Sequence, residues 1–140
     1  MTTKLVGVHP DLVAKITRVL DVMASMGHPM IVTDGLRTMP EQAALWRKGR
    51  VSGNPGPIVT NCDGIQKRSN HQMQADHFGH AVDCAFVVDG APSWDESLPW
   101  LTYGTTCESE HLIWGGRWKT PDKPHCELPV LVTGDPPLKA

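Results

Sequence analysis

The sequence predicts an α+β fold in which early helices pack on a small antiparallel sheet. Apolar residues recur at helical spacing through residues 9–27. Short runs rich in β-branched residues follow at 29–33 and 80–89. The chain has 140 residues, which suffices for one hydrophobic core but is short for two, so we expect a single domain over residues 1–140.

The first helix is expected over residues 9–27. His9-Pro10-Asp11 is a suitable start, because proline is pre-set for the first turn and an acid is favourable at the positive end of the helix dipole. Gly27 is a suitable end. The apolar positions that recur at helical spacing are Leu12, Ile16, Val19, Leu20 and Met23.

Two further helices are expected. One opens at Thr38, a candidate N-cap, and runs to Gly49. The other covers residues 95–110, where Pro99 and Gly104 weaken the helical pattern.

The expected strands cover residues 29–33, 80–89 and 125–128, and the turns Asp34-Gly35 and Asp89-Gly90 end the first two. Between residues 49 and 79, Gly, Pro, Asn and Asp dominate. A loop of this length inside a compact domain is usually functional or disordered, and the histidines at its end favour a functional role.

Composition excludes several classes of protein. Apolar residues make up 40% of the chain and charged residues 20%, which is ordinary for a soluble globule, and the net charge of −2 gives no sign of a nucleic-acid partner. No apolar run reaches the ~20 residues of a membrane span, so we expect no membrane anchor. The N-terminus lacks the pattern of a signal peptide, so we expect a cytoplasmic protein. We also expect a monomer. In a reducing compartment the four cysteines are expected to be free thiols.

The candidate site lies in two distant segments. His71, His77 and His80 fall within ten residues, just before Asp83, and His125 follows Asp122 much later. Asp83 interrupts an apolar strand, where a carboxylate is costly unless it is paired or bound to a metal. A metal ligand and a structural salt bridge are both compatible with it. Strand alternation places Glu127 on the face of His125 and turns Cys126 to the core.

This set of residues suits a hydrolytic zinc ion. Catalytic zinc takes three protein ligands and keeps a fourth position for water, whose pKa it lowers from ~15.7 towards ~7. A nearby carboxylate such as Asp122 would take the proton of that water and deliver it to the leaving amine. Arg37 is the candidate cation for the developing oxyanion, with a surface arginine as its alternative.

The chain resembles the zinc D-alanyl-D-alanine carboxypeptidase and L-alanyl-D-glutamate endopeptidase family, which includes many phage endolysins. The resemblance spans about residues 30–128. The family's motifs are Ser-x-His, Gly-x-Ala-x-Asp, Trp-Gly-Gly-x-Trp and Asp/Glu-x-x-His. The matching segments here are Ser69-Asn70-His71, Gly79-His80-Ala81-Val82-Asp83, Trp114-Gly115-Gly116-Arg117-Trp118 and Asp122-Lys123-Pro124-His125.

The resemblance implies a hedgehog/DD-peptidase-like fold with a single zinc site. It implies His71, Asp83 and His125 as zinc ligands, Asp122 as general base, and Arg37 as the residue that holds the substrate or oxyanion. One departure leaves an alternative open. Residues 73–78 intervene between the histidine and Gly79, and an alignment without this insertion puts Asp76 in the histidine position, with His77 beside it. His71 is preferred because Ser69 and Gln72 flank it in the family manner and a loop insertion costs little.

The function that the resemblance implies is hydrolysis of the stem peptide of bacterial peptidoglycan, between L-Ala and D-Glu, by a phage endolysin. Such an enzyme would wait in the host cytoplasm and reach the cell wall at lysis. A D,D-carboxypeptidase or dipeptidase, which shares the metal ligands, is one alternative. A non-catalytic wall-binding or virion domain is another.

Overall fold

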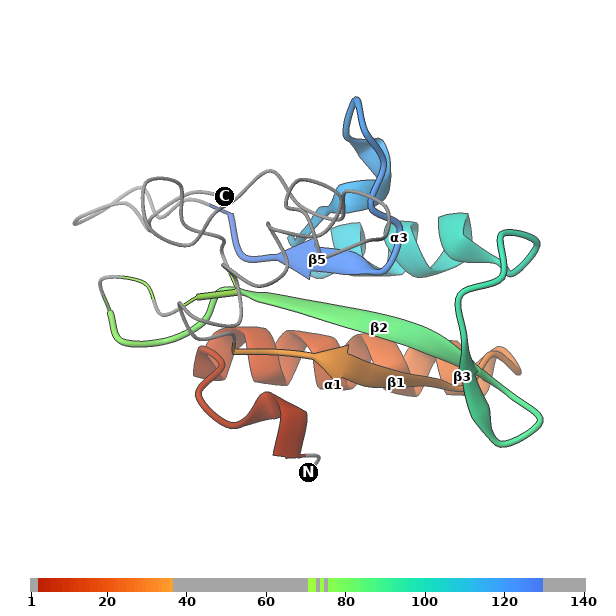
Figure 1. Ribbon diagram of the computed structural model, residues 1–140, viewed down its shortest axis with the longest axis horizontal. Coiled ribbons are helices and arrows are strands. Elements are labelled where there is room, and N and C mark those ends of the chain that lie inside the picture. The colour runs from red at the N-terminus through yellow and green to blue at the C-terminus, as the bar shows by residue number, and fades with distance from the viewer. Residues whose placement is uncertain (1–2, 37–70, 73, 75, 130–140) are drawn as a thin grey trace, which may run out of the picture.

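The computed structural model describes residues 3–36, 71–72, 74 and 76–129 (Figure 1). Its helices are α1 (Pro10–Ser25) and α3 (Trp100–Ser109), with short 3-10 turns η1 (Thr3–Leu5) and η2 (Gly115–Arg117). Its strands are β1 (Met30–Asp34), β2 (Ala81–Val88), β3 (Ala91–Ser93), β4 (Ile113–Trp114) and β5 (His125–Glu127). The helix expected from Thr38 to Gly49, and most of the long segment up to residue 79, lie outside the described residues.

Within the described residues, five strands form one antiparallel sheet in the order β1-β2-β5-β4, with β3 paired to β2. In Figure 1 both helices lie behind this sheet, so one face is covered by helices. The α+β architecture is therefore confirmed.

The core fills the space between the sheet and the two helices. Strand alternation turns Val82, Cys84 and Phe86 of β2 towards the helices, where all three are buried. Helix α1 contributes Leu12, Ile16, Val19 and Met23, each with no exposed surface. As a result, the residues between them on β2, including Asp83, point to the opposite face of the sheet.

Both ends of α1 follow from local chemistry. The Nδ1 atom of His9 accepts a hydrogen bond from the backbone N–H of Asp11, which satisfies one of the unpaired amides of the first turn. At the other end, Gly27 takes a left-handed conformation with φ of 85°. The N–H of Gly27 then reaches the carbonyl of Ala24, and that of His28 reaches Met23, as in a Schellman motif.

The third helix begins later than the sequence pattern predicted. Residues 95–99 form a turn, because the Asp95 carboxylate accepts hydrogen bonds from both the backbone N–H and the hydroxyl of Ser97. Pro99 occupies the N-cap position, and α3 starts at Trp100.

Strand β3 was not expected from the sequence. Asp89 and Gly90 both have positive φ, of 52° and 77°, which suits the two-residue turn of a hairpin. The three residues after this turn, Ala91 to Ser93, therefore pair with the end of β2.

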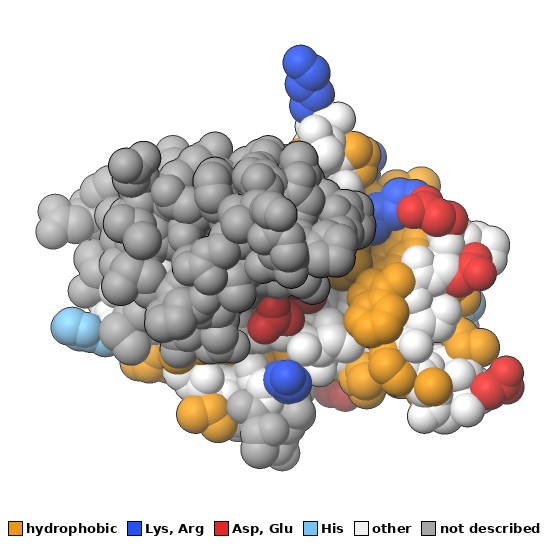
Figure 2. Space-filling model, in the orientation of Figure 1, with side chains coloured by type: hydrophobic (Ala, Val, Ile, Leu, Met, Phe, Trp, Pro, Cys, Tyr) orange, Lys and Arg blue, Asp and Glu red, His pale blue; other side chains and the backbone are white. Residues whose placement is uncertain are grey.

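Three cysteines, Cys84, Cys107 and Cys126, are buried free thiols, as predicted, and Cys62 lies outside the described residues. Neither described helix has the length and apolar character needed to cross a membrane. Over the described part of the face in Figure 2, Lys and Arg side chains are scattered among hydrophobic and acidic ones.

Gly104 of α3 gives a test of this packing. An added Cβ would lie 2.1 Å from the indole ring of Trp114, which is itself fixed by a hydrogen bond from its Nε1 to the carbonyl of Lys123. We expect Gly104→Ala to lower the free energy of unfolding by about 1–3 kcal/mol through overpacking, although alanine gains about 1 kcal/mol in helix propensity. Urea denaturation measures this change. Thr105→Ala, at an exposed neighbouring position, is the control, and a stabilised Gly104→Ala protein would contradict the packing described.

Candidate metal centre

The structure brings His71, Asp83 and His125 together on the face of the sheet opposite the helices. Asp83 lies near the start of β2 and His125 begins β5, and the antiparallel register makes these two residues direct cross-strand partners. His71 approaches from the segment before β2. Within the described residues, these three form the group whose ligand atoms lie close enough to share a metal ion.

The three ligand atoms form a nearly equilateral triangle. Nε2 of His71 and Nδ1 of His125 each lie 3.3 Å from Oδ1 of Asp83, and the two nitrogens are 3.2 Å apart. In a tetrahedral zinc site with bonds of about 2.0–2.1 Å, neighbouring ligand atoms are ~3.3–3.4 Å apart. The triangle therefore has the size of one face of a zinc tetrahedron.

The outward nitrogen of each ring is already engaged. Nδ1 of His71 lies 3.0 Å from the carbonyl oxygen of Gly35, and Nε2 of His125 lies 2.7 Å from a carboxylate oxygen of Glu127. Both partners accept hydrogen bonds, so each neutral ring carries its proton on the outward nitrogen. The inward nitrogens then present lone pairs to the centre, which is the arrangement that metal-binding histidines require.

Asp83 adds a third acceptor to this centre. Its Oδ1 atom is buried and has no hydrogen-bond donor while both rings are neutral. Three lone-pair donors that face one another at 3.2–3.3 Å repel unless a cation lies among them. The donor set therefore fits a divalent metal ion, with imidazole and carboxylate ligands of the kind zinc accepts.

The pKa shifts of Asp83 and His125 also indicate that the site requires a positive charge. Burial opposes ionisation of Asp83, but the charge of His71 and the hydrogen bonds from His125 and His71 outweigh it and hold the pKa of Asp83 well below its ordinary value. Burial would also lower the pKa of His125, but the hydrogen bonds to Asp83 and Glu127 raise it from 6.5 to about 10. A proton on His125 is thus the cation that the site holds when no metal competes for it.

Asp122 lies at the edge of this centre. Its Oδ2 atom is 3.8 Å from Nδ1 of His125, and its side chain is about half exposed, at 49%. The backbone N–H of Asp122 donates to the carbonyl of Gly115, and the N–H of His125 donates to the carbonyl of Asp122. This turn therefore sets the carboxylate beside the metal centre.

The Trp-Gly-Gly segment supports that turn. A Cβ on Gly115 would lie 2.5 Å from the carbonyl oxygen of Asp122, so only glycine permits this close approach. Trp114 is buried, and its Nε1 donates to the carbonyl of Lys123. Trp118 is partly exposed, and its ring centroid lies 4.9 Å from that of His125.

The other predicted candidates lie elsewhere. His77 is exposed, with a left-handed φ of 70°, and is not part of the triangle. Asp76, which an alignment without an insertion would put in the histidine position, instead lies 2.6 Å from Nε2 of His80. His80 is buried and does not belong to the triangle either. Arg37 lies outside the described residues.

Two contributions to the site were not foreseen. The first is the carboxylate of Glu127. Strand alternation had placed Glu127 on the same face as His125, but the sequence alone did not predict a role for it. The carbonyl of Gly35 was known only as part of a turn. Both orient a ring of the triangle.

Comparisons with known proteins agree with this fold. A family model described as D-alanyl-D-alanine carboxypeptidase matches residues 63–128. The chain is 28% identical over 130 residues to the peptidoglycan L-alanyl-D-glutamate endopeptidase CwlK of Bacillus subtilis, which covers 86% of this chain and 72% of that protein. It is also similar to the crystal structure of the L-Ala D-Glu endopeptidase ChiX of Serratia marcescens, with a TM-score of 0.60 and 28% identity over 90% of this chain and 84% of that one.

Together, the family model and the two similar endopeptidases indicate a protein of the peptidase class. The chain is a relative of the D-alanyl-D-alanine carboxypeptidase and L-alanyl-D-glutamate endopeptidase family, which confirms the resemblance found in its motifs.

The raised pKa of His125 predicts how stability depends on pH in protein stripped of metal by a chelator. The folded protein binds the His125 proton more tightly than the unfolded chain does, so the resulting stabilisation is complete below pH 6.5 and is lost as pH rises towards about 10. Urea denaturation at stepped pH values measures it. Glu127→Gln removes one of the groups that raise this pKa and should narrow the pH range over which stability falls. A flat profile between pH 6.5 and 10 would contradict the assignment.

Proposed function

We propose that this protein is a zinc-dependent peptidase that hydrolyses the stem peptide of bacterial peptidoglycan between L-Ala and D-Glu. The observation that carries the proposal is the triangle of His71, Asp83 and His125 with Asp122 at its edge, in a chain similar to two L-alanyl-D-glutamate endopeptidases. Neither the triangle nor the similarity would suffice alone, since metal sites occur in proteins of many functions.

The proposed ligands of one zinc ion per chain are His71, Asp83 and His125. When bound, zinc supplies a Lewis acid and lowers the pKa of a coordinated water. The hydrogen bonds to the Gly35 carbonyl and to Glu127 keep both rings in the tautomer that can bind a metal. The rings are ordered when the protein folds, so metal binding does not have to order them.

Asp122 is the proposed general base. Its partial exposure leaves the carboxylate accessible to substrate, and its position next to His125 sets it beside the reacting centre. It would take a proton from the attacking water and return that proton to the nitrogen of the leaving D-Glu residue. The fixed turn through Gly115 would hold it in place through both transfers. Arg37 remains the proposed cation for the oxyanion, on the strength of its motif.

We further propose that the enzyme acts as a phage endolysin, in the host cell wall at lysis, because the family it resembles includes many such enzymes. A second candidate activity is D,D-carboxypeptidase, which is favoured by the description of the matching family model. A non-catalytic wall-binding or virion domain would bind metal without any hydrolysis.

Mass spectrometry of the muropeptides released from purified sacculi separates these functions. New N-terminal D-Glu supports the endopeptidase, whereas loss of terminal D-Ala supports the carboxypeptidase. Stoichiometric zinc with no released peptide would favour the binding domain.

The choice between His71 and His77 gives one prediction. Because His71 lies in the triangle and His77 is exposed, His71→Ala should lower zinc occupancy and turnover together, while His77→Ala should leave both close to wild type. Metal analysis and a stem-peptide hydrolysis assay on both variants measure this. If only His77→Ala loses zinc, the ligand assignment is wrong.

The role of Asp122 gives another. Asp122→Asn keeps the shape of the side chain but cannot accept the proton, so we expect retained zinc and a turnover lower by about 10²–10⁴-fold. Asp21→Asn, at an exposed position of α1, is the matched control and should retain full activity. Loss of zinc from Asp122→Asn would instead make Asp122 a ligand.

A further inference from the structure

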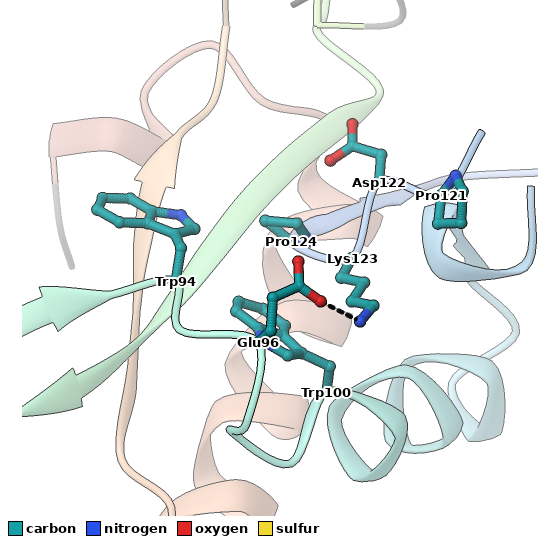
Figure 3. Close-up of a pocket in the computed structure, with 7 residues that line it drawn as sticks. All are labelled: Trp94, Glu96, Trp100, Pro121, Asp122, Lys123 and Pro124. Carbon is teal, nitrogen blue, oxygen red and sulfur yellow. Dashed lines mark hydrogen bonds and ion pairs between the residues drawn. The ribbon is translucent and has the colours of Figure 1, made fainter.

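A separate pocket adjoins the metal centre on the side of Asp122. It has a volume of about 410 Å³, within the range of small-ligand sites. Figure 3 shows two tryptophans and a Glu–Lys pair in this pocket, with the Asp122 carboxylate at one side. The lining residues are Trp94, Glu96, Trp100, Pro121, Asp122, Lys123 and Pro124.

The walls of the pocket are held by hydrogen bonds. Trp100 is buried and donates from Nε1 to the carbonyl of Asp95. The carbonyl of Lys123 accepts from Nε1 of Trp114, and the carbonyl of Pro124 accepts from the hydroxyl of Tyr103. The pocket is therefore preformed, which lowers the entropic cost of binding a ligand in it.

Two opposite charges stand in this pocket. Nζ of Lys123 lies 2.7 Å from Oε2 of Glu96, and their side chains are 37% and 86% exposed. An ion pair with this exposure contributes little to folding, so its groups can exchange partners with a ligand at small cost. Trp94, which is 51% exposed, adds an apolar surface beside them. The chemistry suits a zwitterion on a short hydrocarbon chain: an ammonium for Glu96, a carboxylate for Lys123, and methylene groups for Trp94.

The position of Asp122 shows which part of a substrate would reach the pocket. If Asp122 protonates the leaving amine, the leaving segment lies on its side of the metal centre, and the pocket begins at Asp122. In a stem peptide cut before D-Glu, the leaving segment is D-Glu followed by a diamino acid residue. Where that residue is diaminopimelate, its free end carries both an ammonium and a carboxylate; where it is lysine, the free end carries an ammonium alone.

We propose that this pocket binds the zwitterionic end of a diaminopimelate residue, with Lys123 on its carboxylate and Glu96 on its ammonium. The inference rests on the proposed peptidase function and adds a preference between two kinds of cell wall. It also gives one four-residue segment three tasks, since Asp122, Lys123 and His125 would serve as base, specificity residue and ligand.

The test compares two synthetic stem peptides that differ in the third residue, diaminopimelate or L-lysine. Wild-type protein should hydrolyse the diaminopimelate peptide with a kcat/KM at least about tenfold higher, mainly through KM, since this peptide makes one more charge-assisted hydrogen bond than the lysine peptide does. Lys123→Gln should remove this preference by slowing only the diaminopimelate peptide. Glu96→Gln should slow both peptides, because both offer an ammonium. Arg18→Gln breaks an exposed ion pair with Glu110 on another part of the molecule and should change neither rate.

Binding of the leaving fragment, D-Glu-diaminopimelyl-D-Ala, tests the pocket without any turnover. Calorimetry should find weaker binding to Lys123→Gln than to wild type, and equal binding to Arg18→Gln. Equal kcat/KM for the two peptides in wild-type protein, or a Lys123→Gln variant that slows both alike, would overturn the subsite while leaving the peptidase proposal standing. If neither peptide is cut, the peptidase proposal fails, and the calorimetry still decides whether the pocket binds the zwitterion.

Discussion

The mutual repulsion of three lone-pair donors is the constraint around which this structure is organised. Oδ1 of Asp83 and one nitrogen each of His71 and His125 lie 3.2–3.3 Å apart, and the other nitrogen of each ring faces a hydrogen-bond acceptor. Such a cluster is stable only around a positive charge. The surrounding groups hold the three donors in this arrangement. Glu127 and the Gly35 carbonyl hold the rings in place, and the sheet register sets the carboxylate opposite His125.

Trp114 contacts both the packed helix α3 and the turn that carries two residues of the candidate site. Its ring is packed so tightly that a Cβ on Gly104 or on Gly116 would lie 2.1–2.2 Å from its atoms. The same indole donates a hydrogen bond to Lys123, in the turn that carries Asp122 and His125. Helix α3 therefore supports the turn that carries the proposed base and ligand in two ways: it packs against Trp114, and the hydroxyl of its own Tyr103 donates to the carbonyl of Pro124. A substitution far from the reacting atoms can disturb catalysis by this route.

The sequence pattern predicted the elements whose bounds depend on residues close together in the chain. Helix α1 has both a regular apolar period and recognisable ends, and Asp83 was conspicuous because a carboxylate is rare in an apolar strand. Strand β3 escaped prediction because it is three residues long, contains Pro92, and pairs only because the preceding turn returns the chain. The start of α3 depended on whether Asp95 would bond to Ser97, which competes with helix formation. The choice between His71 and His77 could not be made from spacing alone, since an insertion separates His71 from Gly79.

The alternation of side chains along β2 and β5 has a consequence for how the proposed zinc ion would be acquired. Cys84 follows Asp83 and Cys126 follows His125, and both thiols point into the core while their neighbours point out. A slip of one residue in either strand would turn sulfur towards the ion in place of oxygen or nitrogen. Thiolates bind zinc strongly. If zinc reached the chain before these strands had paired, a cysteine would compete with the proposed ligands and would stabilise a sheet with the wrong register. Correct loading of the proposed ion would therefore require that the sheet is already formed when the ion arrives.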